Sequence, residues 1–221
     1  MSKKSYMITI VSDKNSWINA HLPSLTGRLK RIGHRVRQVH QVRQIPRGEL
    51  VFFLGCGQMA GLKILARNKH NLVVHESALP QGKGWSPLTW QVLEGKKIIT
   101  VSLFEAVAAV DSGRIYLQDK IKLRGNELVE DWRLLQAEAT VKLCAEFVRR
   151  YPDIVKAGKK QRGKSTFYPK RGPQDSRLDA NKTLRTQFGL LRTVDNERYP
   201  AFFEMNGETY ILKISRKERR N

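Results

Sequence analysis

The sequence predicts an α/β domain in which a mostly parallel sheet is flanked by helices, followed by a small C-terminal β-hairpin. Short β-rich segments alternate with helix-like segments between residues 6 and 103, and such alternation is typical of parallel sheets. The run at 50–54 is continuously apolar, as in a strand covered on both faces. Asn206-Gly207 separates two further β-rich segments, which is a strong hairpin signal.

The first half of the alternation contains three strands and two helices. Residues 6–11 are rich in β-branched side chains and are followed by turn and N-cap residues, so we expect a strand and then a helix over 17–33. Residues 34–39 alternate apolar and polar side chains, like a half-buried strand. The strand at 50–54 is followed by a short helical stretch over 58–68.

The second half predicts a strand over 72–75, a helix over 87–94 and a strand over 98–103. Ser86 and Pro87 supply a cap and a first helical residue. Because ligands of open α/β sheets bind outside the carboxyl ends of the strands, we expect the site at that edge of a Rossmann-like sheet.

A long helix follows, because apolar residues recur every three or four positions on one stripe. The stripe consists of Leu128, Trp132, Leu135, Ala139, Leu143, Phe147 and Tyr151. Pro152 ends the helix, and the basic, glycine-containing stretch 156–172 is typical of a linker or mobile loop. We therefore predict a catalytic domain over 1–154, and an extension over 155–221 with the linker, a short helix and the hairpin of 199–214.

The chain is strongly basic, with 41 Lys and Arg against 20 Asp and Glu among 221 residues, a net charge of +21. Acid-free stretches lie between Lys14 and Glu49 and between Asp153 and Asp175. Such charge favours anionic ligands, although a solvated basic surface is an equal alternative. No apolar run approaches the ~18 residues of a membrane helix, and we identify no secretory signal and no metal motif. We therefore expect a cytoplasmic protein with both cysteines reduced and no membrane partner.

The most informative segment begins at His75, at the carboxyl end of a predicted strand. It reads His-Glu-Ser-Ala-Leu-Pro-Gln-Gly-Lys-Gly over 75–84, and its proline and glycines are typical of an active-site loop. On position alone His75 is equally compatible with a hydrogen-bonded structural residue. Asp111-Ser-Gly113 follows the strand at 98–103, and as an isolated tripeptide it is an ordinary turn.

Together the two segments resemble the formyltransferases that use N10-formyltetrahydrofolate. The family pattern Asn-x-His-x-Ser-x-Leu-Pro-x-x-x-Gly, then Asp-x-Gly, is matched by His75, Ser77, Leu79, Pro80, Gly84, Asp111 and Gly113. Segments 86–95, 167–168, 173–179, 192–196 and 199–203 resemble members that formylate amino sugars carried on nucleotides. The chain departs at the family asparagine, where it has Val73, and Asn71 is too far along the strand to replace it.

The resemblance implies a catalytic His75, oriented by Asp111, that stabilises the oxyanion of formyl transfer or moves the proton. Ser77 binds His75 or the loop backbone, or merely caps the turn. The resemblance also places the pterin of N10-formyltetrahydrofolate against Phe104, Glu105, Ala106, Val107 and Val110. From the residues alone, ordinary core is the favoured interpretation for most of this apolar segment.

On the acceptor side, the resemblance implies contacts from the loop at Lys83, Gly84 and Trp85, with Arg192 and Tyr199 as further candidates. Lys83 would meet a phosphate and Trp85 would stack on a sugar or base. The resulting hypothesis is an N-formyltransferase acting on a nucleotide-linked amino sugar, with a homodimer as a possibility and no specific nucleic-acid partner. The alternatives are a glycinamide ribonucleotide formyltransferase, and a non-catalytic basic nucleic-acid-binding protein on the same fold. A methionyl-tRNA formyltransferase would need a larger C-terminal domain.

Overall fold

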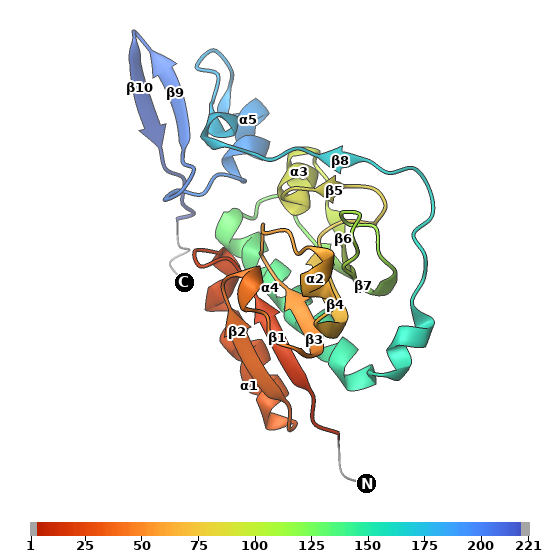
Figure 1. Ribbon diagram of the computed structural model, residues 1–221. Coiled ribbons are helices and arrows are strands. Elements are labelled where there is room, and N and C mark those ends of the chain that lie inside the picture. The colour runs from red at the N-terminus through yellow and green to blue at the C-terminus, as the bar shows by residue number, and fades with distance from the viewer. Residues whose placement is uncertain (1–3, 218–221) are drawn as a thin grey trace.

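A computed structural model describes residues 4–217 and has a six-stranded sheet at its centre (Figure 1). The strand order is β2-β1-β3-β4-β6-β7. These strands are β1 Met7–Val11, β2 Arg35–Val39, β3 Gly48–Phe53, β4 Asn68–His75, β6 Ile98–Glu105 and β7 Ile115–Lys122. Strands β1 to β4 pair in parallel, whereas β6 pairs antiparallel with both β4 and β7. The predicted α/β architecture is confirmed. The sheet departs from parallel pairing only near one edge, where β6 runs antiparallel to both of its neighbours.

The helices and the short two-stranded pairings surround this sheet. The helices are α1 Leu22–Arg31, α2 Leu62–Leu65, α3 Pro87–Leu93, α4 Val129–Arg150 and α5 Leu184–Leu191, with 3-10 turns at Trp17–Ala20, Val42–Gln44, Asp153–Ala157 and Pro173–Ser176. The short pairings are β5 Lys83–Gly84 with β8 Phe167–Tyr168, and β9 Ala201–Met205 with β10 Glu208–Leu212. No helix among residues 4–217 is both long and apolar enough to cross a bilayer.

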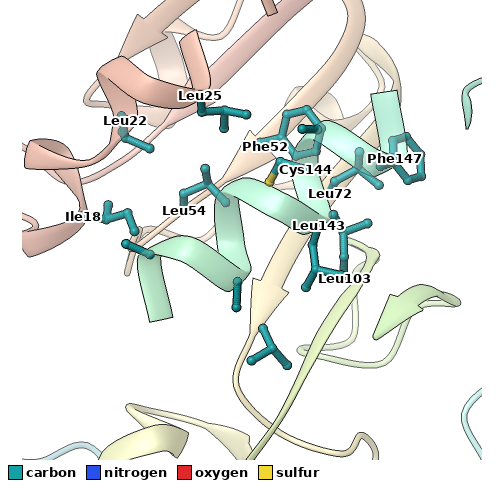
Figure 2. Packing of buried hydrophobic residues seen from close by; sticks show 14 of the residues in the cluster. Ile18, Leu22, Leu25, Phe52, Leu54, Leu72, Leu103, Leu143, Cys144 and Phe147 are labelled. Carbon is teal, nitrogen blue, oxygen red and sulfur yellow. The ribbon is translucent and has the colours of Figure 1, made fainter. Parts of the chain in front are cut away.

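One face of the sheet packs against α4 and α1, as Figure 2 shows. Leu143, Cys144 and Phe147 of α4 meet side chains such as Phe52 of β3 and Leu72 of β4, all buried. The predicted apolar stripe of the long helix is therefore the inner face of α4. Cys144 and the half-buried Cys56 are both free thiols, as expected.

The opposite face has a smaller apolar cluster built on Val11, Val51 and Phe53. Val73 packs against this cluster. Because side chains two apart on a strand share a face, Val73 lies on the same face of β4 as His75. The strand therefore presents an apolar side chain where the family pattern has an amide.

Element boundaries differ from the sequence prediction where proline and loop residues intervene. The stretch expected as one helix over 17–33 divides into a 3-10 turn and α1, because Pro23 lacks an N–H and suits the start of a helix. The helix expected over 58–68 is confined to α2, and β4 begins at Asn68 rather than residue 72. Strand β7 was not predicted.

The segment expected to be a linker or mobile loop is tied to the domain instead. We call residues 159–171 the strap. Lys159 exchanges two backbone hydrogen bonds with Ile115, and β8 pairs with β5. The strap therefore returns across the loop that follows His75, and Figure 1 shows β8 beside β5.

The C-terminal part forms a small unit with its own core. Figure 1 shows α5 and the β9–β10 hairpin grouped at one end of the molecule. Leu178, Leu191, Val194 and Ala201 are buried together there. The predicted hairpin is confirmed, with Asn206 and Gly207 at positive φ in its turn.

Candidate active site

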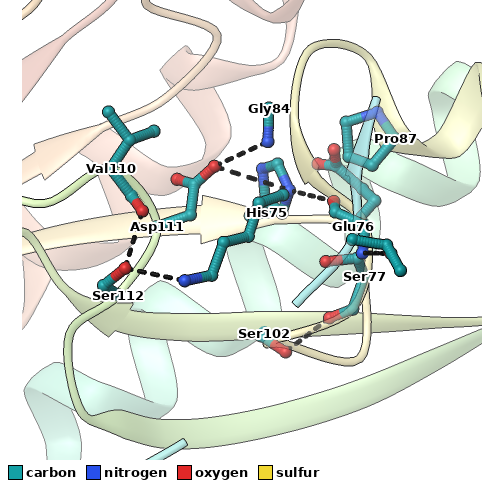
Figure 3. Close-up of polar contacts among 12 residues, drawn as sticks. His75, Glu76, Ser77, Gly84, Pro87, Ser102, Val110, Asp111 and Ser112 are labelled. Carbon is teal, nitrogen blue, oxygen red and sulfur yellow. Dashed lines mark hydrogen bonds and ion pairs between the residues drawn. The ribbon is translucent and has the colours of Figure 1, made fainter. Parts of the chain in front are cut away.

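The site forms where the carboxyl end of β4 meets the turn between β6 and β7. His75 is the last residue of β4, and its ring is nearly buried. Its Nε2 lies 2.8 Å from the Gly82 carbonyl oxygen and 3.9 Å from Asp111 Oδ2. A carbonyl oxygen only accepts hydrogen bonds, so Nε2 carries the proton and faces the carboxylate (Figure 3).

Asp111 is held in place by its backbone and by the loop from Gly82 to Gly84, which we call the glycine loop. It adopts a left-handed φ of 49°, which aspartate tolerates better than most residues. The Gly84 N–H donates to Asp111 Oδ2 at 2.9 Å. At Gly113 a Cβ would lie 1.7 Å from the Glu105 carbonyl oxygen, so only glycine fits the close approach of this turn to β6.

The loop from Gly82 to Gly84 connects the two candidate catalytic residues. The Gly82 carbonyl accepts a hydrogen bond from His75, and the Gly84 N–H donates one to Asp111. A Cβ at Gly84 would lie 2.5 Å from the Tyr168 carbonyl oxygen, so the strap requires glycine here. The loop therefore fixes the distance between imidazole and carboxylate.

The strap completes this arrangement from the outside. Thr166 Oγ1 accepts from the Gly82 N–H, and the Thr166 carbonyl accepts from the Lys83 N–H. Gln161 Nε2 donates to the carbonyls of Asp111 and Gly113 at 2.9 Å each. The strap thus binds both site loops, and the basic linker composition gave no sign of this role.

The asparagine expected from the family pattern has no direct substitute on β4. Val73 offers no hydrogen bond, and Asn71 uses its amide nitrogen on the Leu65 carbonyl. Asn71 also pairs through its backbone N–H with Glu105 and through its carbonyl with the Ala106 N–H. Asn71 therefore fixes strand ends, in agreement with the prediction that it does not replace the missing amide.

Ser77 and Glu76 lie directly after the histidine. The Ser77 hydroxyl is buried and makes no hydrogen bond with the described residues, so neither of its expected partners is bound to it here. The Glu76 carboxyl is also buried, and burial raises its pKa, although nearby His75 and a hydrogen bond with Gln136 oppose the increase. Glu76 is a site neighbour that sequence reasoning missed, because nothing in the sequence signals its burial.

Lys83 occupies an unexpected position. Only 6% of the residue is exposed, and Nζ donates to Ser112 Oγ at 2.7 Å. The ammonium also lies 5.8 Å from the ring centroid of Phe167 in the strap. The side chain therefore points to the Asp111 turn, not to an exposed phosphate subsite as expected.

The segment expected to face the pterin divides into buried and exposed parts. Phe104 is core and meets the His75 ring edge-on at 6.4 Å, while Glu105 binds His70 and Tyr116. Beyond the half-buried Ala106, the next residues emerge from the core, with Val107 and Val110 44% and 46% exposed. An exposed apolar segment leading directly to Asp111 fits a flat ring better than the alternative of ordinary core.

Of the expected acceptor residues outside the loop from Gly82 to Gly84, only Trp85 directly follows it. Its ring is 43% exposed, and Lys170 of the strap lies over it at 5.0 Å. Arg192 is buried, and its guanidinium donates to the carbonyl and carboxylate oxygens of Glu127. Tyr199 is 41% exposed at the start of the hairpin, with Arg198 over its ring. Within residues 4–217 no hydrogen bond or ion pair joins Arg192 or Tyr199 to His75.

Within residues 4–217 no three His, Cys, Asp or Glu side chains gather as a metal site would require. The arrangement thus consists of an oriented imidazole, a carboxylate, a buried ammonium and an exposed apolar segment. Such a set supplies a proton carrier and hydrogen-bond donors, the two requirements of acyl transfer at a carbonyl.

Comparison with known proteins agrees with this chemistry. A family model described as formyl transferase matches residues 6–146. A curated methionyl-tRNA formyltransferase from Thermodesulfovibrio yellowstonii is 26% identical over 145 residues, which are 65% of this chain and 47% of that protein. The chain spans about half the length of the curated relatives it matches.

Solved structures share the fold. A likely sugar N-formyltransferase from Mycobacterium tuberculosis, 18% identical, superposes with a TM-score of 0.73 over 98% of this chain and 100% of that one. HypX from Aquifex aeolicus in complex with tetrahydrofolic acid, 17% identical, gives 0.79 over 95% of this chain and 37% of that one.

Proposed function

Because the chain belongs to the formyl transferase family, we propose that it moves a formyl group from N10-formyltetrahydrofolate to the amino group of a nucleotide-linked amino sugar. The observation that carries this proposal is the juxtaposition of His75 and Asp111, whose side chains come from loops 36 positions apart in the chain and meet at 3.9 Å. The glycine loop between them holds that geometry.

Formyl transfer makes two demands on the protein. The attacking amine leaves negative charge on the formyl oxygen, which a hydrogen-bond donor must stabilise. The amine also loses a proton, which a base must accept and pass on. Asp111 faces the protonated Nε2 of His75, which leaves Nδ1 of the neutral ring as the nitrogen that can accept a proton. The pair is thus suited to accept the proton from the amine and return it to the leaving nitrogen.

The formyl donor has a suitable surface beside this pair. The exposed segment at Val107–Val110 precedes Asp111 and presents apolar side chains. A pterin packing there would bring its carrier arm toward His75. The tetrahydrofolic acid bound by HypX, which shares this fold, supports the same class of donor.

For the acceptor, the exposed Trp85 and the cations of the strap support a nucleotide-linked substrate. Trp85 offers an aromatic face beside the loop that holds Asp111, and Lys170 adds positive charge over it. Bases stack on aromatic rings, and phosphates bind such cations. The full mutual coverage with the likely sugar N-formyltransferase from Mycobacterium tuberculosis supports the sugar class of acceptor.

Methionyl-tRNA is the second candidate acceptor, because the curated relative is named for it and the net charge of +21 suits a nucleic acid. The decisive experiment presents the purified protein with N10-formyltetrahydrofolate and three acceptor classes: nucleotide-linked amino sugars, methionyl-tRNA and glycinamide ribonucleotide. We expect one amino sugar to gain the mass of one CO unit. Formylation of methionyl-tRNA or glycinamide ribonucleotide alone would contradict the proposed acceptor, and no transfer to any of them would contradict the proposed activity.

A further inference from the structure

Lys83 is a buried cation without an ionic partner. Only 6% of Lys83 is exposed, and among residues 4–217 no carboxylate oxygen lies within 4.0 Å of its Nζ. Its one hydrogen bond is the donation to Ser112 Oγ, so two of the three ammonium N–H groups have no protein acceptor there. Burying an unpaired charge is costly, and such a group persists where it meets negative charge from a ligand.

The backbone places this ammonium inside the candidate site. Lys83 lies between Gly82, whose carbonyl accepts from His75, and Gly84, whose N–H donates to Asp111. Its own side chain reaches Ser112, the residue after Asp111. Lys83 is therefore joined to both candidate catalytic residues through its two neighbours in the same loop.

The strap closes the outer side of this lysine. The Lys83 N–H donates to the Thr166 carbonyl, and the Phe167 ring lies 5.8 Å from Nζ. The ammonium therefore lies between an aromatic ring of the strap and the Ser112 hydroxyl of the Asp111 turn. At the same time Val73 supplies no side-chain donor at the position where the family pattern has an amide.

We propose that Lys83 is a catalytic residue of the formyl transfer, its ammonium donating a hydrogen bond to the formyl oxygen as negative charge develops there. The inference rests on the proposed function and assigns the donor that Val73 does not supply.

In the step concerned, the lone pair of the acceptor amine forms a bond to the formyl carbon while the carbonyl π pair moves to oxygen. Lys83 stabilises that oxygen. His75 takes one proton from the attacking nitrogen and delivers it to N10 of the folate. The pair on oxygen then reforms the carbonyl, and the bond between the formyl carbon and N10 breaks with its electrons on N10.

The first test is the rate of transfer to the acceptor found above, in the Lys83→Met and Ser112→Ala variants. Losing an oxyanion donor lowers kcat by about 10² to 10³, so we expect that loss in Lys83→Met with the KM for the donor little changed. If Lys83 only anchored the turn through Ser112, the two variants would lose equal activity. We expect instead that Ser112→Ala loses about fivefold or less, as for one neutral hydrogen bond. Lys30→Met, on the exposed side of α1, is the matched control.

The second test does not depend on turnover. N10-formyltetrahydrofolate labelled with ¹³C at the formyl carbon is bound to each variant without acceptor, and its dissociation constant and ¹³C shift are measured. A hydrogen bond from Lys83 polarises the carbonyl, so the bound carbon should resonate downfield in the wild type and move upfield in Lys83→Met but not in Lys30→Met.

The outcomes separate the two proposals. A donor that does not bind the wild-type protein overturns the proposed function and this inference with it. A donor that binds and reacts in the wild type, with Lys83→Met matching Lys30→Met in rate and shift, overturns the role of Lys83 alone. A Lys83→Met variant that equals Ser112→Ala in rate, with an unchanged shift, assigns Lys83 a structural role and also overturns it.

Discussion

Glu76 follows the candidate catalytic histidine, and its carboxyl is buried beside the site. Burial raises its pKa, while His75 and Gln136 partly oppose that increase. Asp111, by contrast, accepts a hydrogen bond from the Gly84 N–H of the loop.

We expect the pH dependence of stability to change in Glu76→Gln. Because the folded-state pKa exceeds the unfolded value, the native protein binds more protons than the unfolded chain between the two, so wild-type stability falls as pH rises through that window. The variant lacks this loss. The Tm of the variant minus the Tm of the wild type should therefore be larger at pH 8 than at pH 5. A Tm difference that does not change with pH would contradict the raised pKa of Glu76.

At this scale the residue types of the site could be predicted, but not all of their surroundings. His75 and Asp111 follow from a motif whose spacing is visible in the sequence, and their contact is confirmed. The burial of Lys83 depends on Phe167 and Thr166, about 84 positions away, and no local pattern announces such a contact. Arg192 was wrongly expected to be free for a substrate, because its partner Glu127 lies 65 positions away.

At the scale of elements, one buried ion pair joins α4 to the C-terminal unit. Arg192 Nε and Nη2 donate to Glu127 at 3.0 Å each, and the Trp132 indole N–H donates to the Arg192 carbonyl. Burial alone would raise the pKa of Glu127, but N–H groups of Arg124 and Gly125, together with Arg192, lower it. The pair thus holds the end of α5 against the start of α4.

Arg192→Met should therefore destabilise the protein by about 3–5 kcal/mol, because it leaves the Glu127 carboxylate buried without its cation. Urea unfolding measures the change. Arg149→Met is the matched control, since Arg149 forms an exposed pair with Glu146 on the same helix and should have little effect. If both variants unfold at the same urea concentration, the buried pair is not what joins these elements.

The elements with regular patterns were predictable, and those defined by distant partners were not. Strands β1 to β4 and helix α4 follow from alternation and from the apolar stripe. Strand β7 has three exposed positions and no continuous apolar run, so its pairing with β6 decides its structure. Strand β8 is two residues long and exists only because β5 lies beside it.

For the whole molecule, the hairpin leaves apolar side chains uncovered. Met205, Tyr210 and Ile211 are 46%, 47% and 67% exposed. The pairing places Met205 and Tyr210 on one face of the hairpin and Ile211 on the other, and exposed apolar side chains concentrated on one element are typical of an interaction surface. A two-fold dimer would bury the same hairpin of both copies. The homodimer therefore stays a prediction from the sequence.

Sedimentation equilibrium tests it. We expect the wild-type protein to be a dimer and Ile211→Lys to be a monomer, because a charge on the most exposed apolar side chain of the hairpin opposes association. Ile98→Lys places the same change at another exposed isoleucine, 57% exposed against 67% for Ile211, at the start of β6 and should leave the dimer intact. A monomeric wild type, or equal behaviour of the two variants, would contradict the predicted interface.

The pairing of His75 with Asp111 as the catalytic unit is tested most directly by single-turnover transfer of labelled formyl to the acceptor, with donor binding measured in parallel. His75→Ala and Asp111→Ala should each slow transfer by about 10² to 10⁴, and because the pair acts as a unit, the double variant should be no slower than the worse single one. Donor affinity should remain close to that of the wild type in all three. Unchanged transfer in either single variant would contradict the assignment.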